Sequence, residues 1–362
     1  GNLINNGRIV ANPSSPGVYG SSNLLCYGTS LQTLGGTGVY DTLGAITVGT
    51  DAQVILQTDL SLYGSSTSAV NGSLDLSTHV LSGIGKFQTR EAASVTTNVT
   101  SAPSGTYTIS LDPTAYSSGI NTANVAVGLL VTGAGILPNT YILNTSSSAS
   151  SITLSNPVSA GVTSVTITGR PALLSISNAN GIDGAVAVSG TKSFGAGTNY
   201  IYNASTTSPF PLSSNNIMGN VSLFAPITSN KSVSIGGVLS LQNGNFTIRA
   251  SDTIRMRTSA AIAGAPFSTS KHIVTEASGG LIGKFRMDSI LTASLLPIGT
   301  SSHYLPVTLD FANYTNVYTS VYEGMTQDGT LTGTSLTTQQ LSKVVNAVWD
   351  ITRSTGETSG NM

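Results

Sequence analysis

Apolar residues alternate with small polar residues along most of this chain, in short runs that end at glycine or asparagine. Leu74 and Leu76, for example, are separated and flanked by polar residues, and the same period of two recurs through residues 220–258. A turn such as Asn243-Gly244-Asn245 lies between successive runs of that region. A period of two with this punctuation is typical of β-strands, so the pattern predicts many short strands joined by tight turns.

Two architectures fit this rhythm: a meandering antiparallel sandwich, and a β-solenoid in which each coil stacks on the one before it. Stacking places like residues over like residues, which makes ladders of charges repulsive and ladders of Ser, Thr and Asn favourable. Only 8% of the 362 residues are charged, and 40 are glycine. We therefore predict parallel β-solenoid coils over residues 1–89 and 173–267.

Two other regions have a different pattern. Residues 90–172 open with a polar stretch from Ala92 to Gly105 and continue with short strands such as Ser151–Leu154, which indicates a small β module inserted between the coils. From residue 268 the strands lengthen, and valines alternate with tyrosines over Val317–Tyr322. One packed and one solvated face suits a sheet of a C-terminal β-sandwich over residues 268–362. The predicted fold class is therefore all-β.

Charge and cysteine content exclude several classes of function. The net charge is −1, and 14 Lys and Arg residues spread over the chain make no basic patch for nucleic acid. The most apolar stretch, Val125–Leu137, is too short and too rich in glycine to cross a membrane, so no membrane insertion is expected. Cys26 is the only cysteine, which rules out an intramolecular disulfide and a cysteine zinc cluster. No cofactor motif is found.

Several phrases of residues 90–352 resemble parts of large secreted surface proteins of the Bacteroidota. They are Ile182–Gly184, Gly190–Phe194, Asn199–Asn203, Gly279–Phe285, Leu296–Thr300, Tyr304–Leu309 and Val345–Ile351. Gly133–Ile142 is similar to a module that is widespread in repetitive bacterial surface and phage proteins. The resemblance implies solenoid coils followed by a terminal sandwich, in a protein exported to the cell surface. In that family further strands follow the strand that contains the tryptophan, whereas this chain stops at Met362. The resemblance therefore implies either a fragment of a longer protein or a sandwich whose last strand is missing and is supplied from elsewhere.

The candidates for catalysis and metal binding are few. Asp51, Asp59 and Asp75 form the densest acidic group before the module, and we expect them to be turn residues because no basic or aromatic partner recurs with them. None of the histidines His79, His272 and His303 has the spacing of a metal ligand, so we expect solvated strand positions and no metal.

The charge cluster that stands out joins Asp252 to the arginines around it, Arg249, Arg255 and Arg257. A surface ion pair is the favoured interpretation. The alternative is a glycan contact, in which Arg255 and Arg257 share a strand face and bind a carboxylate, while tyrosines such as Tyr318 and Tyr322 stack on sugar rings.

These observations predict a secreted structural or adhesive protein of a bacterial cell surface, without catalysis, whose partner is itself or a neighbouring repeat. It is either the subunit of a head-to-tail fibre or a segment of a long adhesin. Unprotected sheet edges pair with other chains, so we expect the N-terminal segment of one subunit to complete the C-terminal sheet of the next. The predicted contact residues are Leu3, Ile4, Ile9, Val10, Trp349 and Ile351. A carbohydrate-binding module that recognises surface glycans and a polysaccharide-degrading β-helix enzyme stay open as alternatives.

Overall fold

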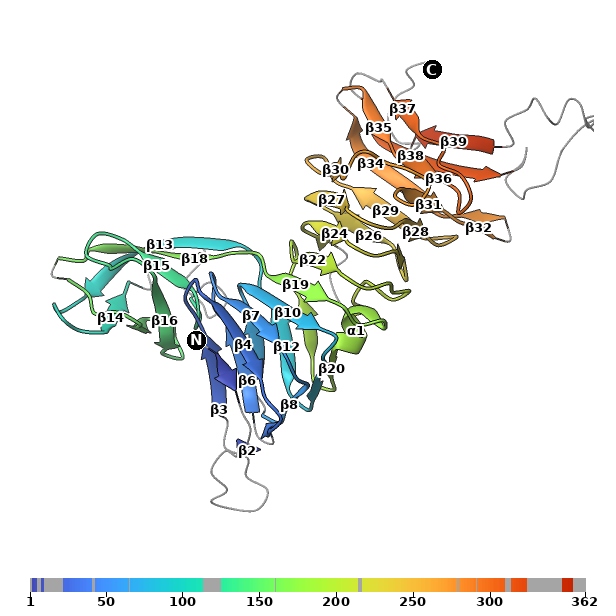
Figure 1. The fold of residues 1–362 in the computed structure, drawn as a ribbon. Helices are drawn as coiled ribbons and strands as arrows, with labels where there is room; N and C mark the ends of the chain where they lie inside the picture. The colour runs from blue at the N-terminus through green and yellow to red at the C-terminus, as the bar shows by residue number, and fades with distance from the viewer. Residues whose placement is uncertain are drawn as a thin grey trace, which may run out of the picture. The chain divides into compact units, whose positions relative to one another are not determined.

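A computed structural model (Figure 1) describes the chain over residues 2–4, 8–9, 22–40, 43–64, 66–112, 125–159, 161–213, 217–278, 280–290, 292–309, 314–323 and 347–353. The chain divides into two compact units. Unit 1 comprises Gly1–Ser177, Gly184–Asn199 and Ser213–Asn215, and unit 2 comprises Asn178–Asp183, Tyr200–Leu212 and Asn216–Met362. Nearly all regular structure is β, and the helix described is α1 (Gly181–Ala185).

The first parallel sheet of unit 1 joins four strands that follow one another at intervals of three along the chain and a fifth strand that comes after the inserted module. Its strands, in order, are β1 (Leu3–Ile4), β4 (Leu31–Gly35), β7 (Gln53–Leu56), β10 (Ser73–Ser77) and β19 (Leu173–Ile176). The register places Val54 beside Leu74 and Leu74 beside Leu174, and each is 1% exposed or less. The alternating sequence thus becomes a continuous aliphatic ladder on the inner face, which is the main source of stability.

Unit 1 has two further groups of parallel strands. A larger sheet contains β3 (Ser22–Cys26), β6 (Leu43–Val48), β8 (Leu60–Leu62), β9 (Thr67–Val70), β11 (Leu81–Gly83), β12 (Lys86–Thr89), β20 (Val186–Val188) and β21 (Lys192–Phe194), while β2 (Arg8–Ile9) pairs with β5 (Val39–Tyr40). Hydroxyl groups also stack from strand to strand, as between Ser61 and Ser82, whose Oγ atoms lie 3.1 Å apart. Such ladders occupy positions where stacked charges would repel each other.

Between β12 and β19 the chain forms a closed antiparallel barrel. In order around the barrel its strands are β13 (Ala93–Ser101), β14 (Thr108–Leu111), β17 (Ser151–Leu154), β16 (Thr140–Thr145), β15 (Leu130–Thr132) and β18 (Ser164–Gly169). Its core is aliphatic and includes Ile109, Ile142 and Ile167, each 1% exposed or less. The barrel therefore has a hydrophobic core of its own.

The barrel begins and ends at one point of the parallel sheets. The backbone nitrogen of Ala172 donates to the carbonyl oxygen of Arg90 at 3.3 Å, and that of Leu173 donates to Gly72 at 2.9 Å. The barrel also contacts the sheets directly, because Thr50 donates its backbone N–H to the carbonyl of Gly128 at 2.9 Å. Strand β19 consequently pairs with β10 in parallel, with a register shift between Asp75 and Ser77, although the whole barrel lies between the two strands in the sequence.

Unit 2 repeats the parallel pattern in three sheets. The first contains β22 (Asn199–Tyr202), β24 (Val221–Leu223), β27 (Val238–Leu241) and β30 (Ala261–Ala263), and the second contains β25 (Ile227–Thr228), β28 (Phe246–Ile248), β31 (Ile273–Thr275) and β36 (Ile298–Gly299). The third contains β23 (Ile217–Met218), β26 (Val233–Ile235), β29 (Thr253–Met256) and β34 (Lys284–Ile290) in parallel, then β38 (Tyr314–Glu323) and β39 (Ala347–Arg353) in antiparallel pairing. The antiparallel pairs β32 (Ala277–Ser278) with β33 (Leu281–Ile282), and β35 (Ser294–Leu296) with β37 (Val307–Leu309), complete the unit.

The prediction of an all-β chain with parallel strands is confirmed. The polar stretch Ala92–Gly105, for which no strand was predicted, contains the nine-residue strand β13. A closed barrel needs a strand there to pair with β14 and β18, and the inward positions alternate as Val95, Thr97 and Val99, with Thr97 1% exposed. Val10 lies outside the described residues.

Candidate functional site

A cluster of cations and one aromatic ring lies on the face of the third sheet of unit 2. We define this cation–aromatic cluster as Arg255 on β29, Lys284, Arg286 and Asp288 on β34, and Tyr318 on β38. The strand register places Arg255 beside Arg286 and Arg286 beside Tyr318. Since alternate residues of a strand point to the same face, these side chains form a row across three neighbouring strands.

Asp288 forms ion pairs with both arginines of the cluster. The Nε atom of Arg255 donates to its two carboxylate oxygens at 2.7 and 2.8 Å, and Nε of Arg286 lies 3.0 Å from Oδ1. The Asp288 carboxylate is 8% exposed, whereas the side chain of Arg255 is 41% exposed. Hydrogen bonding to Asp288 raises the pKa of Arg255, so this guanidinium stays charged.

Tyr318 completes the cluster. Arg286 donates from Nη1 to the Tyr318 hydroxyl at 2.8 Å, and its Cζ lies 5.1 Å from the ring centroid. The ammonium of Lys284 lies 5.9 Å from the same centroid. Three cations beside one carboxylate leave a net positive charge, so the chemistry of the cluster suits an anionic group on a bound polymer.

The sequence analysis predicted the wrong partners for the charge cluster around Asp252. Asp252 accepts from the hydroxyl of Ser229 at 2.6 Å, and Arg249 donates to the backbone oxygen of Thr207 at 3.4 Å. Asp288, 33 positions from Arg255 along the chain, takes the place predicted for Asp252. Arg255 and Asp288 come together because their strands pair, and such a pairing cannot be predicted from the residues that are adjacent to either one in the sequence.

Of the four residues proposed for a glycan contact, two lie in the cation–aromatic cluster and two are not part of it. Arg255 and Tyr318 lie in the cation–aromatic cluster. Arg257 is exposed, follows the end of β29 at Met256 and is not part of the cluster. Tyr322 lies on β38, and its side chain is outside the described part of the structure.

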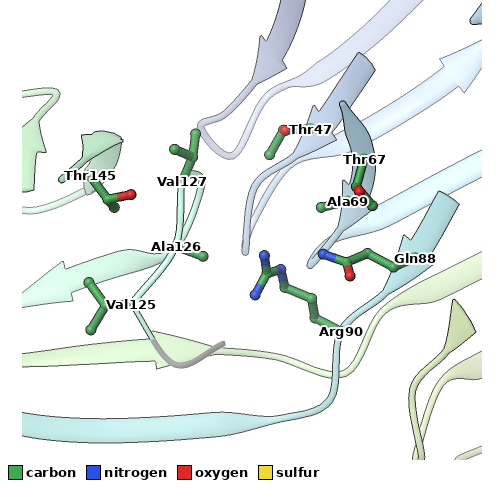
Figure 2. A pocket seen from close by; sticks show the side chains of 9 residues that line it. All are labelled: Thr47, Thr67, Ala69, Gln88, Arg90, Val125, Ala126, Val127 and Thr145. Carbon is green, nitrogen blue, oxygen red and sulfur yellow. The ribbon is translucent and has the colours of Figure 1, made fainter. Parts of the chain in front are cut away.

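A second candidate site is a pocket of about 480 Å³ in unit 1, between the sheet of β6, β9 and β12 and the loop that precedes β15 (Figure 2). The side chain of Arg90 points into it, and Gln88 and Thr47 lie on the same side. Val125–Val127 and Thr145 line the opposite side, from the barrel. The volume is that of a typical small-ligand site.

Arg90 is the charged residue among the nine that line this pocket. Burial lowers the pKa of its guanidinium, because removing water disfavours the charged form. A ligand carboxylate or sulfate would offset that cost, while Thr47, Thr67, Gln88 and Thr145 offer hydroxyl and amide groups beside it. Sequence reasoning missed Arg90; its position at the end of a strand, where the inserted module begins, was the available signal.

The three aspartates suspected of forming an acidic group do not meet one another. Asp51 lies 3.3 Å from Arg170, Asp59 accepts from the backbone of Val80 at 2.9 Å, and Asp75 accepts from the backbone of Ser77 at 2.7 Å. Asp75 therefore holds a local turn at the end of β10, as polar residues commonly do, whereas Asp59 joins the chain before β8 to the next coil.

The histidines differ from the expectation of solvated strand positions. His79 lies 3.3 Å from Asp59. His272 is fully buried, with Nδ1 3.0 Å from the carbonyl oxygen of Ser268 and Nε2 2.9 Å from that of Thr300. The prediction is wrong for His272, because the coil-to-coil contacts that enclose it cannot be read from its neighbours in sequence.

The residues predicted to join subunits lie at sheet margins. Leu3 and Ile4 form β1, the first strand of its sheet, and Ile4 is 62% exposed. Trp349 and Ile351 lie on β39, the last described strand of the third sheet of unit 2, where the indole nitrogen of Trp349 donates to the carbonyl of Leu305 at 3.0 Å. Ile9 lies on β2.

Among the described residues, no group of three or more His, Cys, Asp or Glu side chains is placed to hold a metal ion. The described helical structure includes no segment with the length and apolarity of a membrane span. Scans against known protein families, curated proteins and solved structures each return no significant match.

Proposed function

We propose that this chain is an extracellular structural or adhesive protein of a bacterial cell surface, and that it works without catalysis. The observation that carries the proposal is the repeated parallel pairing of strands three places apart, such as β4 with β7 and β7 with β10. Strands that return to the same sheet about 20 residues later are the signature of a β-solenoid. On this proposal each coil gives one strand to each of three sheets, and the barrel is the inserted module.

The ends of the sheets support association with further copies. Among the described strands β1 and β39 are at the ends of their sheets, the position from which strands are added, and Ile4 places an exposed apolar side chain at one of these margins. On this proposal the C-terminal strands form a sandwich that a neighbouring subunit or repeat completes. A contact between different surfaces of identical subunits that does not close on itself gives a fibre.

Negative-stain electron microscopy of the purified chain, with light scattering beside it, tests the proposal. We expect fibres with a regular axial repeat. Ile4→Lys puts a charge on the β1 margin and should shorten or abolish the fibres, because charged side chains protect sheet edges from pairing. Leu137→Lys is the matched control, since Leu137 is also apolar and 49% exposed but lies on the barrel. Monomers at every concentration, or fibres unaffected by Ile4→Lys, would contradict the head-to-tail arrangement.

The cation–aromatic cluster favours glycan binding as a second function. Polygalacturonate, a polymer with a carboxylate on each sugar, is a suitable probe in affinity electrophoresis at low salt. Arg255→Gln removes a cation whose side chain is 41% exposed and should reduce retardation, while Arg257→Gln, outside the cluster, should not. Equal effects of the two variants would show that only general charge is involved.

A further inference from the structure

The barrel and the parallel sheets of unit 1 enclose another pocket, distinct from the one around Arg90. We call it the seam pocket, and its volume is about 720 Å³. Its polar lining includes Asp51 and Asn71 from the parallel sheets, Asn139 from the barrel, and Arg170 where the chain leaves the barrel. Leu130 and Leu173 add apolar surface. Its volume falls in the range that accommodates one or two sugar-sized ligands.

Asn71 brings an unusual feature to this pocket. Its side chain is fully buried, and its Oδ1 has no hydrogen-bond partner in the described part of the structure. Its Nδ2 lies 3.5 Å from the carbonyl oxygen of Val48, at the limit of a hydrogen bond. Buried polar atoms in proteins are nearly always paired, so an orphan acceptor that lines a pocket indicates a missing donor.

Asp51 and Arg170 set the charge of the pocket. Oδ1 of Asp51 lies 3.3 Å from Nη1 of Arg170, and Oδ2 accepts from the hydroxyl of Tyr141, also at 3.3 Å. A carboxylate offers about four acceptor sites, which leaves room for further donors. The two charges cancel, so an anion would meet the carboxylate of Asp51 and a cation would meet the guanidinium of Arg170. The pocket is therefore suited to a neutral ligand.

The ligand that fits must both donate and accept hydrogen bonds. Asp51 presents acceptors, whereas Arg170 presents donors, and a hydroxyl group can satisfy both kinds. The apolar side chains of Leu130 and Leu173 suit the C–H face of a sugar ring. We propose that the seam pocket binds a neutral pyranose unit of a glycan. This inference rests on the proposed adhesive function and gives it a class of target.

The charge of the lining separates this pocket from the other two candidate sites. The Arg90 pocket has no acidic residue among those that line it, and the cation–aromatic cluster has three cations to one carboxylate. Both suit an anionic group. The seam pocket alone pairs a carboxylate with a guanidinium and an orphan acceptor.

Saturation-transfer NMR on the full chain tests the proposal. The probes are the methyl glycosides of glucose, galactose, mannose and N-acetylglucosamine, with glucuronate as the anionic comparison. We expect at least one neutral glycoside to bind, and Asp51→Asn and Arg170→Gln each to weaken it about tenfold, because each loses a charge-assisted hydrogen bond. Asp59→Asn is the matched control, since Asp59 accepts from the backbone of Val80 and lies outside the pocket.

The outcomes are distinct. If no neutral glycoside binds, if Asp51→Asn and Arg170→Gln leave binding unchanged, or if glucuronate binds more tightly than the glycosides, the proposal is overturned. Gln53→Ala tests the same pocket should Asp51→Asn fail to fold, because Gln53 lines it and is exposed. Fibres without sugar binding would refute only this inference, whereas sugar binding by a strictly monomeric chain would refute only the fibre.

Discussion

At Cys26 the chain places its single thiol on the inner face of β3, where the residue is 2% exposed. Burial raises the pKa of this thiol from 9.0 to about 11, because the thiolate would lose its hydration inside the sheet. Thiolate is the reactive form of cysteine, so both burial and the raised pKa make this thiol unreactive.

We predict that iodoacetamide at pH 8 leaves Cys26 unlabelled in the native chain and labels it fully in denaturant, as mass spectrometry would show. Because the folded pKa is above the unfolded one, the thiol's contribution to stability is complete below pH 9 and is lost as the pH rises toward 11. Cys26→Ala should flatten that part of the stability profile. Rapid labelling of the native chain would contradict the burial of β3.

Gly72 occupies a position where the surrounding backbone leaves no space for a side chain. A Cβ atom at this position would lie 2.2 Å from the carbonyl oxygen of Gly49 and 2.5 Å from that of Ala52. The carbonyl of Gly72 itself accepts from Leu173, so the turn cannot move without disturbing β19.

We predict that Gly72→Ala destabilises unit 1 by about 2 kcal/mol or more, the cost of forcing an atom into a closed site. Thermal denaturation followed by circular dichroism should show this as a Tm lower by about 5 °C. Gly236→Ala is the control, because a Cβ there would meet its nearest atom at 3.4 Å. An equal shift in both variants would mean that the clash is relieved by local movement.

At the scale of elements, alternation was enough to place many strands. The run predicted over Ser151–Leu154 is β17, and the strand predicted over residues 316–323 forms most of β38. What the alternation could not supply is which strands lie beside each other. Asp51 and Arg170 are far apart in the sequence and meet only because the barrel returns to the sheet beside β10. Pockets made by such returns were consequently not predicted, whereas turn residues such as Asp75 were.

The barrel is predicted to be separable from the sheets. Its two ends are joined by the hydrogen bond between Ala172 and Arg90, and the pairing of β19 with β10 involves no residue of the barrel. Replacing residues 93–169 with a short Gly-Ser linker should therefore leave a soluble chain with the β-type circular dichroism of the parallel sheets. Aggregation, or loss of that signal, would show that the sheets need the barrel to fold.

At the scale of the whole molecule, the surface is polar with few charges. Charged residues make up 8% of the chain, and hydroxyl ladders such as that of Ser61 and Ser82 occupy the outer faces. Hydrogen bonds between neutral groups are not screened by salt, whereas surface ion pairs are. The stability of this molecule is thus derived mainly from aliphatic ladders and neutral hydrogen bonds.

We predict that the Tm changes by less than about 3 °C between 0.05 and 1 M NaCl, since there are few exposed ion pairs for salt to screen. Differential scanning calorimetry across that range measures it. Arg255→Gln removes an ion pair and should make the small remaining dependence smaller still. A large fall in Tm with salt would show that ion pairs such as those of Asp288 dominate stability.

The hydrogen bond between the two ends of the barrel also has a mechanical consequence. Tension applied to unit 1 can pass from β10 to β19 through their paired residues, such as Leu74 and Leu174, so the barrel is shielded while that pairing holds. Once the pairing shears, the barrel can unravel and release roughly 280 Å of chain, at about 3.4 Å for each residue between Arg90 and Ala172. A surface protein built in this way would lengthen in a discrete step under load before its remaining sheets separate.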